Sequence, residues 1–405
     1  MRIIKIPIIV GLACVFSFTF SSCKNTETES TSIQNTQIIS DTTNQETTLT
    51  SASVSEIRLE DLVVKNLQIN KARTHVTGLI IDFLEIDAEL IATVDPLSPG
   101  IASSYTATRR PFSTQQRTVF VQPGWTLVES EILAAQYPSQ EEGYQDVYED
   151  DSGNRYVSFG YNDIAVFYTP QGSLIDRVEI PMEYRSQVDF EFASEQEAYE
   201  TAKTFAETVG YRISNYYYVD RLPYEELEIS SRTIDRSTVE EVLPQGWSSD
   251  QDSYVFTLFE DIDGLPMVNS GGHKLSAEYV ANLECVIEVL VTPKGVEYGE
   301  FYFQYENTKV QSTGEMCDIE EALNLFVKET LTGNTLLIPP LKISHISLVY
   351  LGQWEPSTDA VLLRPYWVFE AEETGPDSSG GIEHYYIDAL NKTVVHKKSF
   401  TGPEV

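Results

Sequence analysis

The five histidines are the residues of this chain best suited to hold a metal ion or move a proton, and they stand far apart in the sequence. None belongs to H-E-x-x-H or to another spacing that is typical of zinc ligands. The last two flank the final expected hairpin, where a cross-strand surface pair explains them better than a metal site. The five are His75, His273, His345, His384 and His396.

No motif in the sequence assembles a nucleophile or a pair of catalytic carboxylates. There is no G-x-S-x-G segment, and no motif links a serine, a histidine and an aspartate. Asp261, Asp263 and Gly264 resemble part of a calcium loop, but Phe259 and Ser270 occupy its first and twelfth positions. The 62 acidic residues would supply carboxylate pairs by chance. We therefore expect a protein that is not an enzyme and that carries no cofactor or metal.

Two of the four cysteines, Cys285 and Cys317, lie in the expected folded body. A disulfide between them would close a loop of about 32 residues and would stabilise the fold by roughly 3–4 kcal/mol. Two buried thiols are the favoured alternative. Because no C-x-x-C spacing is present, the pair does not indicate a zinc site.

The first 22 residues have the layout of a secretory signal peptide. Arg2 and Lys5 give a positive start, and the apolar run Pro7–Phe20 follows. A membrane-spanning helix needs about 20 apolar residues, so this run is too short to span a membrane comfortably.

The segment Phe20-Ser21-Ser22-Cys23 resembles the lipobox of bacterial lipoproteins. The resemblance implies that Cys23 receives a lipid, becomes the first mature residue and holds the protein on the outer face of the cell membrane. Phe20 departs from the lipobox, which usually has leucine there. An uncleaved anchor or an ordinary secretory signal is the alternative.

Residues 23–55 are expected to be a disordered tether. From Lys24 to Ser55 the chain has 15 Ser or Thr among 32 residues and no aromatic residue. Such a segment cannot bury enough apolar surface to offset its conformational entropy. As a flexible coil it would span roughly 30 Å between a membrane and a folded body.

The formal net charge of −35 excludes some partners. The sequence has no sizeable basic face, which argues against nucleic acid as a partner. Anionic lipid headgroups would repel the body, so we expect the lipid on Cys23 to make the membrane contact. The acidity either keeps the protein soluble or attracts an envelope protein or a cationic ligand.

Two helices with similar starts are expected to organise the body. Ser194 and Glu197 form a capping-box pattern, and Gly210 ends the first helix. Asp318 and Glu321 repeat the pattern 318 − 194 = 124 residues later. The apolar stripes are Ala198, Ala202, Phe205 and Val209 in the first helix, and Ile319, Ala322, Leu323, Phe326 and Val327 in the second.

The repeated helix start predicts a duplicated α+β unit in which each helix packs on its own antiparallel sheet. The expected fold class is α+β, with two or three domains. We expect a signal peptide over 1–22, a tether over 23–55, an N-terminal domain over 56–190, a middle unit over 191–311 and a C-terminal unit over 312–405.

Alternating apolar residues and turn signals place the strands. We expect one long strand over 77–94, short helices over 113–121 and 125–137, and a strand over 173–180. The other expected strands are 144–148, 156–161, 162–168, 253–259, 283–292, 296–305, 343–351, 361–371 and 383–396, where a turn at Asn391-Lys392 divides the last stretch into a hairpin.

Tyr366, Trp367, Tyr385 and Tyr386 form an aromatic group near the end of the chain. Successive strand residues face opposite sides, so Tyr366 and Trp367 cannot both point into one core. We expect one ring in the core and the other covering a neighbouring domain. An exposed partner surface is the alternative.

Several motifs resemble those of uncharacterised clostridial lipoproteins. They are D-G-L-P at 263–266, V-T-P-K-G-V at 291–296, E-E-A at 320–322, R-P-Y-W at 364–367 and Y-Y-I-D-A at 385–389. The last strands are also similar to PepSY-like domains and to YycH/YycI-type extracytoplasmic regulators of a cell-wall sensor kinase. The resemblance covers residues 192–398, and 84–115 more faintly. YycH/YycI-type proteins usually keep an uncleaved membrane helix, whereas this chain has a lipobox, so their partner does not carry over.

Together these features predict a lipid-anchored, extracytoplasmic interaction or regulatory protein of a Gram-positive cell envelope, without enzymatic activity. A binding lipoprotein for a peptide, a glycan or a cation is the alternative, and a hydrolase is the least favoured. A deep pocket with converging polar groups would favour the binding lipoprotein. An exposed apolar groove or sheet edge would favour the interaction protein.

Limited proteolysis of the mature protein tests the tether. We predict first cuts within residues 24–55 and a surviving body that begins near Glu56, because proteases cleave exposed unfolded segments first. Mass spectrometry of the fragments locates the cuts. A first cut between residues 192 and 398 would contradict the expected boundaries.

Overall fold

The chain divides by its internal contacts into two units, Met1–Ser55 and Glu56–Val405. The computed structural model describes parts of the second unit only. The described residues are 65–70, 75–81, 84–110, 118–135, 142–161, 164–176, 184–231, 246–268, 287–302, 304–333, 341–355, 360–374 and 382–395.

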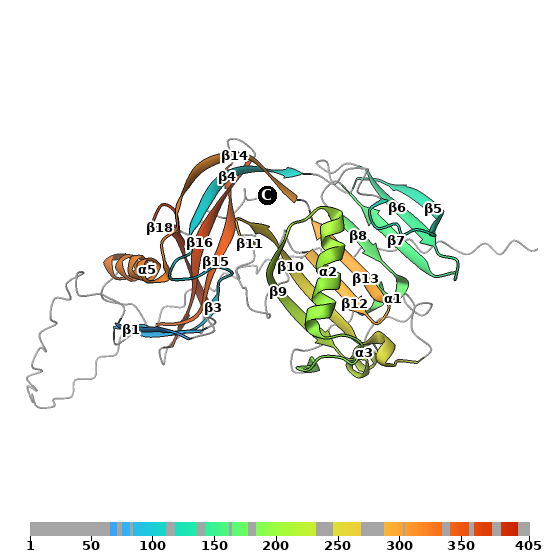
Figure 1. The fold of residues 1–405 in the computed structure, drawn as a ribbon, viewed down its shortest axis with the longest axis horizontal. Coiled ribbons are helices and arrows are strands. Elements are labelled where there is room, and N and C mark those ends of the chain that lie inside the picture. Colours follow the sequence, from blue (N-terminus) through green and yellow to red (C-terminus); the bar gives the residue numbers. More distant parts are fainter. Residues whose placement is uncertain are drawn as a thin grey trace, which may run out of the picture. The chain divides into compact units, whose positions relative to one another are not determined.

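Strands dominate the described residues and a few helices accompany them, as in an α+β protein (Figure 1). No helix in the described ranges is long and apolar enough to cross a membrane.

Seven strands form the first sheet region, in the spatial order β1-β2-β3-β15-β16-β17-β18. Neighbours are antiparallel, except that β3 and β15 run parallel. The strands that begin the body therefore share a sheet with the strands that end it. Their bounds are β1 Lys65–Ile69, β2 His75–Ile81, β3 Leu84–Ile91, β15 Leu341–Glu355, β16 Ala360–Glu373, β17 Ile382–Asp388 and β18 Thr393–Val395.

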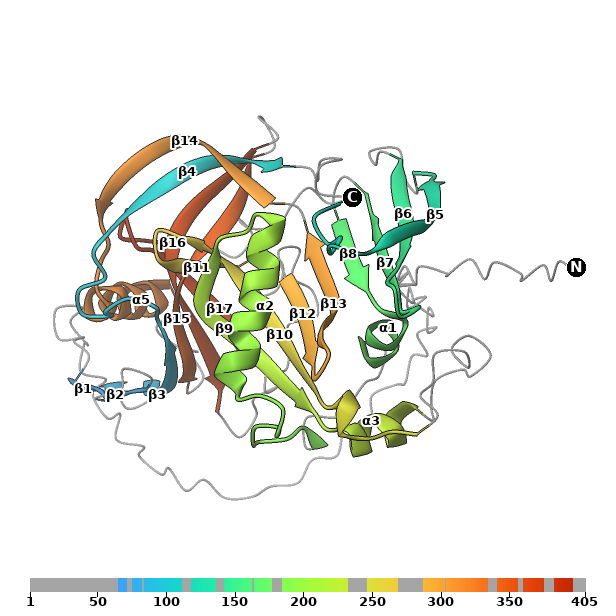
Figure 2. The same cartoon turned by 45° about the vertical axis from the view of Figure 1, so that its right-hand side comes forward.

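A two-stranded ribbon joins the first region at β16. It consists of β4 (Ile101–Arg110) and β14 (Gln304–Glu315), which pair antiparallel (Figure 2). β4 also pairs with Val361–Leu363 of β16.

Eight antiparallel strands form the second sheet region, in the spatial order β9-β10-β12-β13-β8-β7-β6-β5. β11 (Leu265–Val268) connects the two regions, because it forms a hairpin with β10 and runs parallel to β15. The bounds are β5 Thr126–Leu133, β6 Gly143–Glu149, β7 Arg155–Gly160, β8 Ile164–Tyr168, β9 Ile213–Leu222, β10 Ser253–Ile262, β12 Ile287–Thr292 and β13 Gly295–Tyr302.

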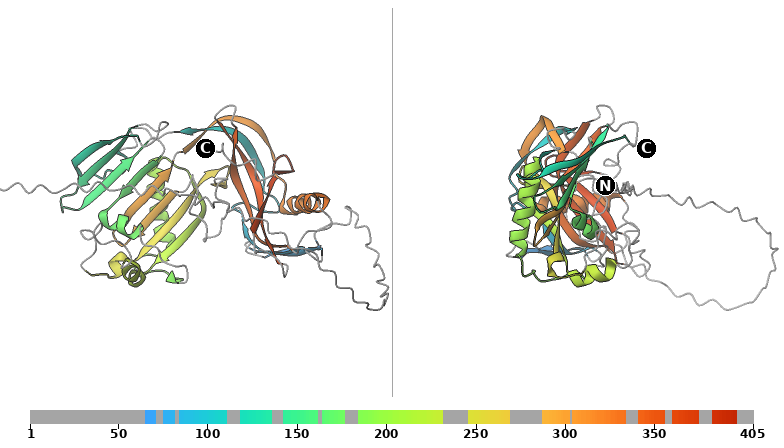
Figure 3. Two further views of the ribbon diagram at one scale, coloured as in Figure 1. Left: turned by 180° about the vertical axis from the view of Figure 1, so that it is seen from behind. Right: turned by 90° about the vertical axis from the view of Figure 1, so that its right-hand side faces the viewer.

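The two longest helices pack on different regions (Figures 1 and 3). Helix α2 (Glu195–Val209) lies against β9, β10, β12 and β13, and its buried alanines pack with Phe256 and Phe301. Helix α5 (Ile319–Gly333) lies against β17 and β18 and packs with Trp367 and Phe369. Each helix thus belongs to its own hydrophobic cluster.

Side chains fix the starts of both helices. Ser194 accepts a hydrogen bond from the Glu197 amide, and the Glu197 carboxylate accepts one from the Ser194 amide. Gly210 then ends α2 with a φ of 107°, a left-handed conformation that glycine adopts without strain. At α5, Asp318 accepts from the Glu321 amide at 2.8 Å.

Two short helices lie on the opposite face of the second region. They are α1 (Pro170–Asp176) and α3 (Tyr224–Ser231), and a 3-10 turn, η4 (Ser249–Gln251), precedes β10. Ile175 and Leu227 pack there with Leu290 of β12.

Three expected elements differ in the structure. The expected helix over 125–137 is strand β5, since pairing with β6 overrides the helix-like spacing of its apolar residues. The expected strand over 173–180 begins as α1, where Pro170 occupies the first helical position and Thr169 accepts from the Gly172 amide at 2.9 Å. The expected single strand over 77–94 is the hairpin β2–β3. Most of the expected helix over 113–121 lies outside the described residues.

The phenylalanines of the two apolar stripes differ in burial, and this sets their contributions to stability. Phe326 is fully buried, whereas Phe205 is half-buried among Phe120, Phe167 and Phe301. We predict that Phe326→Ala lowers the free energy of unfolding by about 3–5 kcal/mol, and that Phe205→Ala lowers it less. Urea denaturation measures both. Val310→Ala, at an exposed site, is the control, and a larger loss at Phe205 than at Phe326 would contradict the packing described.

Candidate functional site

The aromatic group near the end of the chain is mainly core. Tyr366 and Trp367 point to opposite faces of β16, as the alternation predicts, but both are fully buried, as is Tyr386. Trp367 faces α5 and donates from Nε1 to the Cys317 carbonyl at 3.0 Å. Tyr385 is half-buried and packs edge-on against Phe326. The exposed partner surface considered for this group is therefore wrong for Tyr366, Trp367 and Tyr386, because their side chains are buried.

On the second face of β16, the cover comes from the other sheet region. Tyr216 and Tyr218 of β9 and Phe259 of β10 pack there against Tyr366 and Tyr386. The two regions therefore meet over an aromatic layer, which fits the expectation that one ring covers a neighbouring part of the protein.

Of the cysteines considered above, only Cys317 lies among the described residues. It is buried at the start of α5, and burial raises the pKa of its thiol to about 12. A thiol with this pKa is a poor nucleophile. Cys23 and Cys285 lie outside the described residues, so the lipid attachment and the disulfide stay predictions.

A row of alternating histidines and glutamates crosses the first sheet region beneath this aromatic layer. Cross-strand pairing joins each residue to the next, and neighbours in register lie on one face of a sheet. The sequence shows no sign of the row, because its members come from five strands. The His–Glu row comprises His75, Glu89, His345, Glu370 and His384.

The centre of the His–Glu row is linked by polar contacts. His345 lies between two carboxylates, with Nε2 at 3.5 Å from Glu89 and Nδ1 at 3.5 Å from Glu370. Glu370 is buried, and its other oxygen lies 3.7 Å from Nε2 of His384. At the exposed end, His75 turns instead to Asp87 at 2.9 Å.

The geometry of the row suits proton exchange better than metal binding. The two ring nitrogens of His345 point to different partners, so the donor atoms form a line and do not converge. In the described ranges, no three His, Cys, Asp or Glu side chains are grouped to hold a metal ion. The contact with Glu89 raises the pKa of His345, and the charge of Glu370 adds to this effect.

Asp263 clamps the β10–β11 turn to the first region and the ribbon. Its backbone has a φ of 52°, in the left-handed region. Its carboxylate accepts from the Tyr105 hydroxyl at 2.9 Å, from the Tyr350 hydroxyl at 2.8 Å and from the Ser103 amide at 3.0 Å. The residue that resembled part of a calcium loop therefore serves as a turn clamp.

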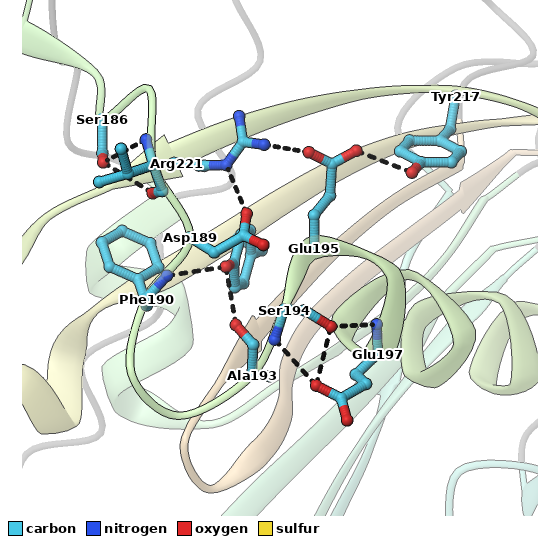
Figure 4. A network of polar contacts seen from close by, with 11 residues as sticks. Ser186, Asp189, Phe190, Ala193, Ser194, Glu195, Glu197, Tyr217 and Arg221 are labelled. Carbon is cyan, nitrogen blue, oxygen red and sulfur yellow. Dashed lines mark hydrogen bonds and ion pairs between the residues drawn. The ribbon is translucent and has the colours of Figure 1, made fainter.

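A second polar network surrounds Arg221 at the start of α2 (Figure 4). The guanidinium contacts Asp189 at 3.4 Å and binds the Glu195 carboxylate, which also accepts from the Tyr217 hydroxyl at 2.8 Å. Tyr254 donates to a carbonyl of the segment that precedes α2. These contacts hold the segment before α2 against β9 and β10, so the network stabilises the fold at this point.

A hydrolase would need a cavity that contains a carboxyl group with a raised pKa, and two cavities and two such glutamates are present among the described residues. The cavities, of ≈ 400 and ≈ 230 Å³, lie along the first turns of α5 and between β4, β14 and β16. Burial raises the pKa of Glu260 to about 7 and also raises that of Glu288, where the charge of Asp176 adds to it. Neither glutamate lines either cavity, so neither could act as a catalytic acid on a molecule bound in one of these two cavities.

Strand β5 is exposed to solvent along almost its whole length. Seven of its eight residues are exposed, and Leu127, Val128 and Ile132 expose 50%, 45% and 69% of their surface. Among the described strands β5 pairs with β6 alone, so its outer edge has no partner there (Figure 2). Such edges with apolar residues are open to pairing with another chain. The sequence missed β5 because its apolar spacing favoured a helix.

Comparison with known proteins gives a fold relationship only. No protein-family profile and no curated sequence matches the chain. The structure is similar to that of an uncharacterised protein from Eubacterium rectale ATCC 33656, with a TM-score of 0.55 and 17% identity over 84% of this chain and 97% of that one. The YpeB C-terminal domain of Bacillus megaterium gives a TM-score of 0.28 and 10% identity over 70% and 96% of the two chains, too low to carry an argument.

The His–Glu row predicts a pH dependence of stability. Because the pKa of His345 is raised in the folded state, its contribution is fully present below the unfolded pKa, about 6.5. That contribution is lost as the pH rises through the folded pKa. We predict that His345→Gln removes this part of the slope of the free energy of unfolding between about pH 6 and 8, a change of at most about 1 kcal/mol.

Urea titrations at several pH values measure this slope. Adding Glu89→Gln to His345→Gln should flatten the slope no further, since the partner is already gone. An unchanged slope in His345→Gln would show that the contacts of this histidine do not affect stability.

Proposed function

We propose that the chain is a lipid-anchored, extracytoplasmic interaction protein of the cell envelope and that it has no enzymatic activity. The observation that carries the proposal is the exposed edge strand β5, with apolar side chains at Leu127, Val128 and Ile132. Monomeric soluble proteins usually protect such an edge, and peptide-binding domains use it to add a strand from a partner.

The amino terminus supports the location. A charged start, a short apolar run and Cys23 in a lipobox-like segment are the parts of a lipoprotein export signal. The Ser- and Thr-rich segment 24–55 would let the body reach a partner beside the membrane. A regulatory role rests on the motif resemblance to PepSY-like and YycH/YycI-type proteins.

The ionisable residues of the body support a role other than catalysis. Asp263, Arg221 and Glu370 are held in contacts that join strands or fix a helix start. The alternative is a binding lipoprotein for a peptide, a glycan or a cation, and the acidic depression beside α5, lined by Asp318, Glu320 and Glu321, would suit a cation. A hydrolase has the least support.

Cys23→Ala tests the anchor. We predict that the variant leaves the membrane fraction and appears in the medium, because one lipidated residue is the whole attachment. Fractionation with immunoblotting measures this, and mass spectrometry of the wild-type terminus detects the lipid. Ser22→Ala keeps a small residue before the cysteine and should stay anchored. An unmodified mature terminus downstream of Cys23 would contradict the proposed lipid anchor.

A further inference from the structure

Strand β5 is amphipathic, and its two faces carry different chemistry. Leu127 and Ile132 stand opposite Tyr148 and Tyr144 of β6, so these two apolar residues share one face of the sheet with Ser130, which stands opposite Asp146. Glu129 and Glu131 stand opposite Val147 and Gln145, on the other face, which they share with Leu133. A register shift at Val128 sets this arrangement. Along its outer edge, which pairs with none of the described strands, β5 therefore presents two apolar side chains on one face and two glutamates on the opposite face.

The sequence around β5 is acidic. Between Thr118 and Asn154 there is no lysine or arginine, and the first cation is Arg155, which lies 2.6 Å from Glu129. Glu131 is exposed, and no cation of the described residues forms an ion pair with it. The acidic residues of this stretch are Glu129, Glu131, Glu141, Glu142, Asp146, Glu149, Asp150 and Asp151.

The negative charge around β5 indicates which kind of chain could pair with its outer edge. A second copy whose β5 paired antiparallel about Ser130 would place Glu129 of one copy beside Glu131 of the other, and like charges across a strand pair are destabilising. The net charge of −35 would add to that repulsion. A segment with cations on one face and apolar side chains on the other would match both faces of β5.

We propose that β5 binds an extended peptide segment in which basic and apolar residues alternate, and that this segment is added to the second sheet region as a further strand beyond β5. The backbone of β5 would supply affinity through ladder hydrogen bonds, and Glu131 would select for the basic residues. This inference deepens the proposed function, since it names the chemistry of the partner.

Synthetic peptides test the inference on the full mature chain carrying Cys23→Ala. A fluorescent octapeptide of alternating Lys and Val should bind, as measured by fluorescence anisotropy. An alternating Glu and Val peptide should not bind, and a peptide with four Lys followed by four Val should bind more weakly. Methylation of alternate backbone nitrogens in the Lys–Val peptide should abolish binding, because strand addition needs those N–H groups.

Two protein variants with the same change in net charge distinguish an effect of the charge at β5 from an effect of the overall charge. Glu131→Lys should weaken binding of the Lys–Val peptide about fivefold, whereas Glu320→Lys on α5, with the same charge change, should leave it unaltered. Circular dichroism checks that both variants fold.

Several outcomes would overturn the inference. Equal binding of the methylated peptide would exclude strand addition, and equal weakening by both variants would show that only net charge acts. A dimer of the chain that Ile132→Ser dissociates would make a second copy the occupant. Because these assays need no lipid, their failure is distinguishable from a failure of the Cys23 anchor.

Discussion

Strand β15 is the constraint on which the rest of the body depends, because parts of the chain from far apart pair with it. β16 pairs along one edge of β15 over almost its whole length. The other edge is shared, with β3 beside Leu341–Ser347 and β11 beside Tyr350 and Leu351. The Tyr350 hydroxyl adds a bond to Asp263 in the β10–β11 turn. The β11–β15 pairing and this bond thus join the second sheet region to β15.

Buried polar groups in this fold mainly fix where strands meet. Asp388 accepts from Arg364 and from two backbone amides of the final turn, so the end of β17 is held against β16. Pro365 lies where the neighbour of β16 changes from β4 to β17, and its carbonyl accepts from the Ala389 amide. A residue without an N–H group costs little at such a changeover.

Local signals were readable in the sequence, and long-range pairing was not. Ser194 with Glu197 predicts the start of α2, because a capping box is complete within four residues. The spacing of the apolar residues in β5 resembled that of a helix. Its pairing with β6 overrides this spacing, and a local sequence pattern does not report such pairing. The His–Glu row depends on the pairing of β3 with β15, and no local pattern reports that register. A neighbouring domain was the expected cover for one of Tyr366 and Trp367, but the sequence could not identify β9 and β10 as that cover.

The parallel pairing of β3 with β15 also fixes when the protein can fold. Leu84 and Leu341 are partners across 341 − 84 = 257 residues, and the β15–β16 hairpin comes late in the chain. A ribosome or an export channel delivers the amino end first, so β1–β3 emerge long before their neighbour exists. The pairing of β3 with β15 can form only after most of β15 has emerged, so β1–β3 must wait without this neighbour until about 260 further residues have been delivered.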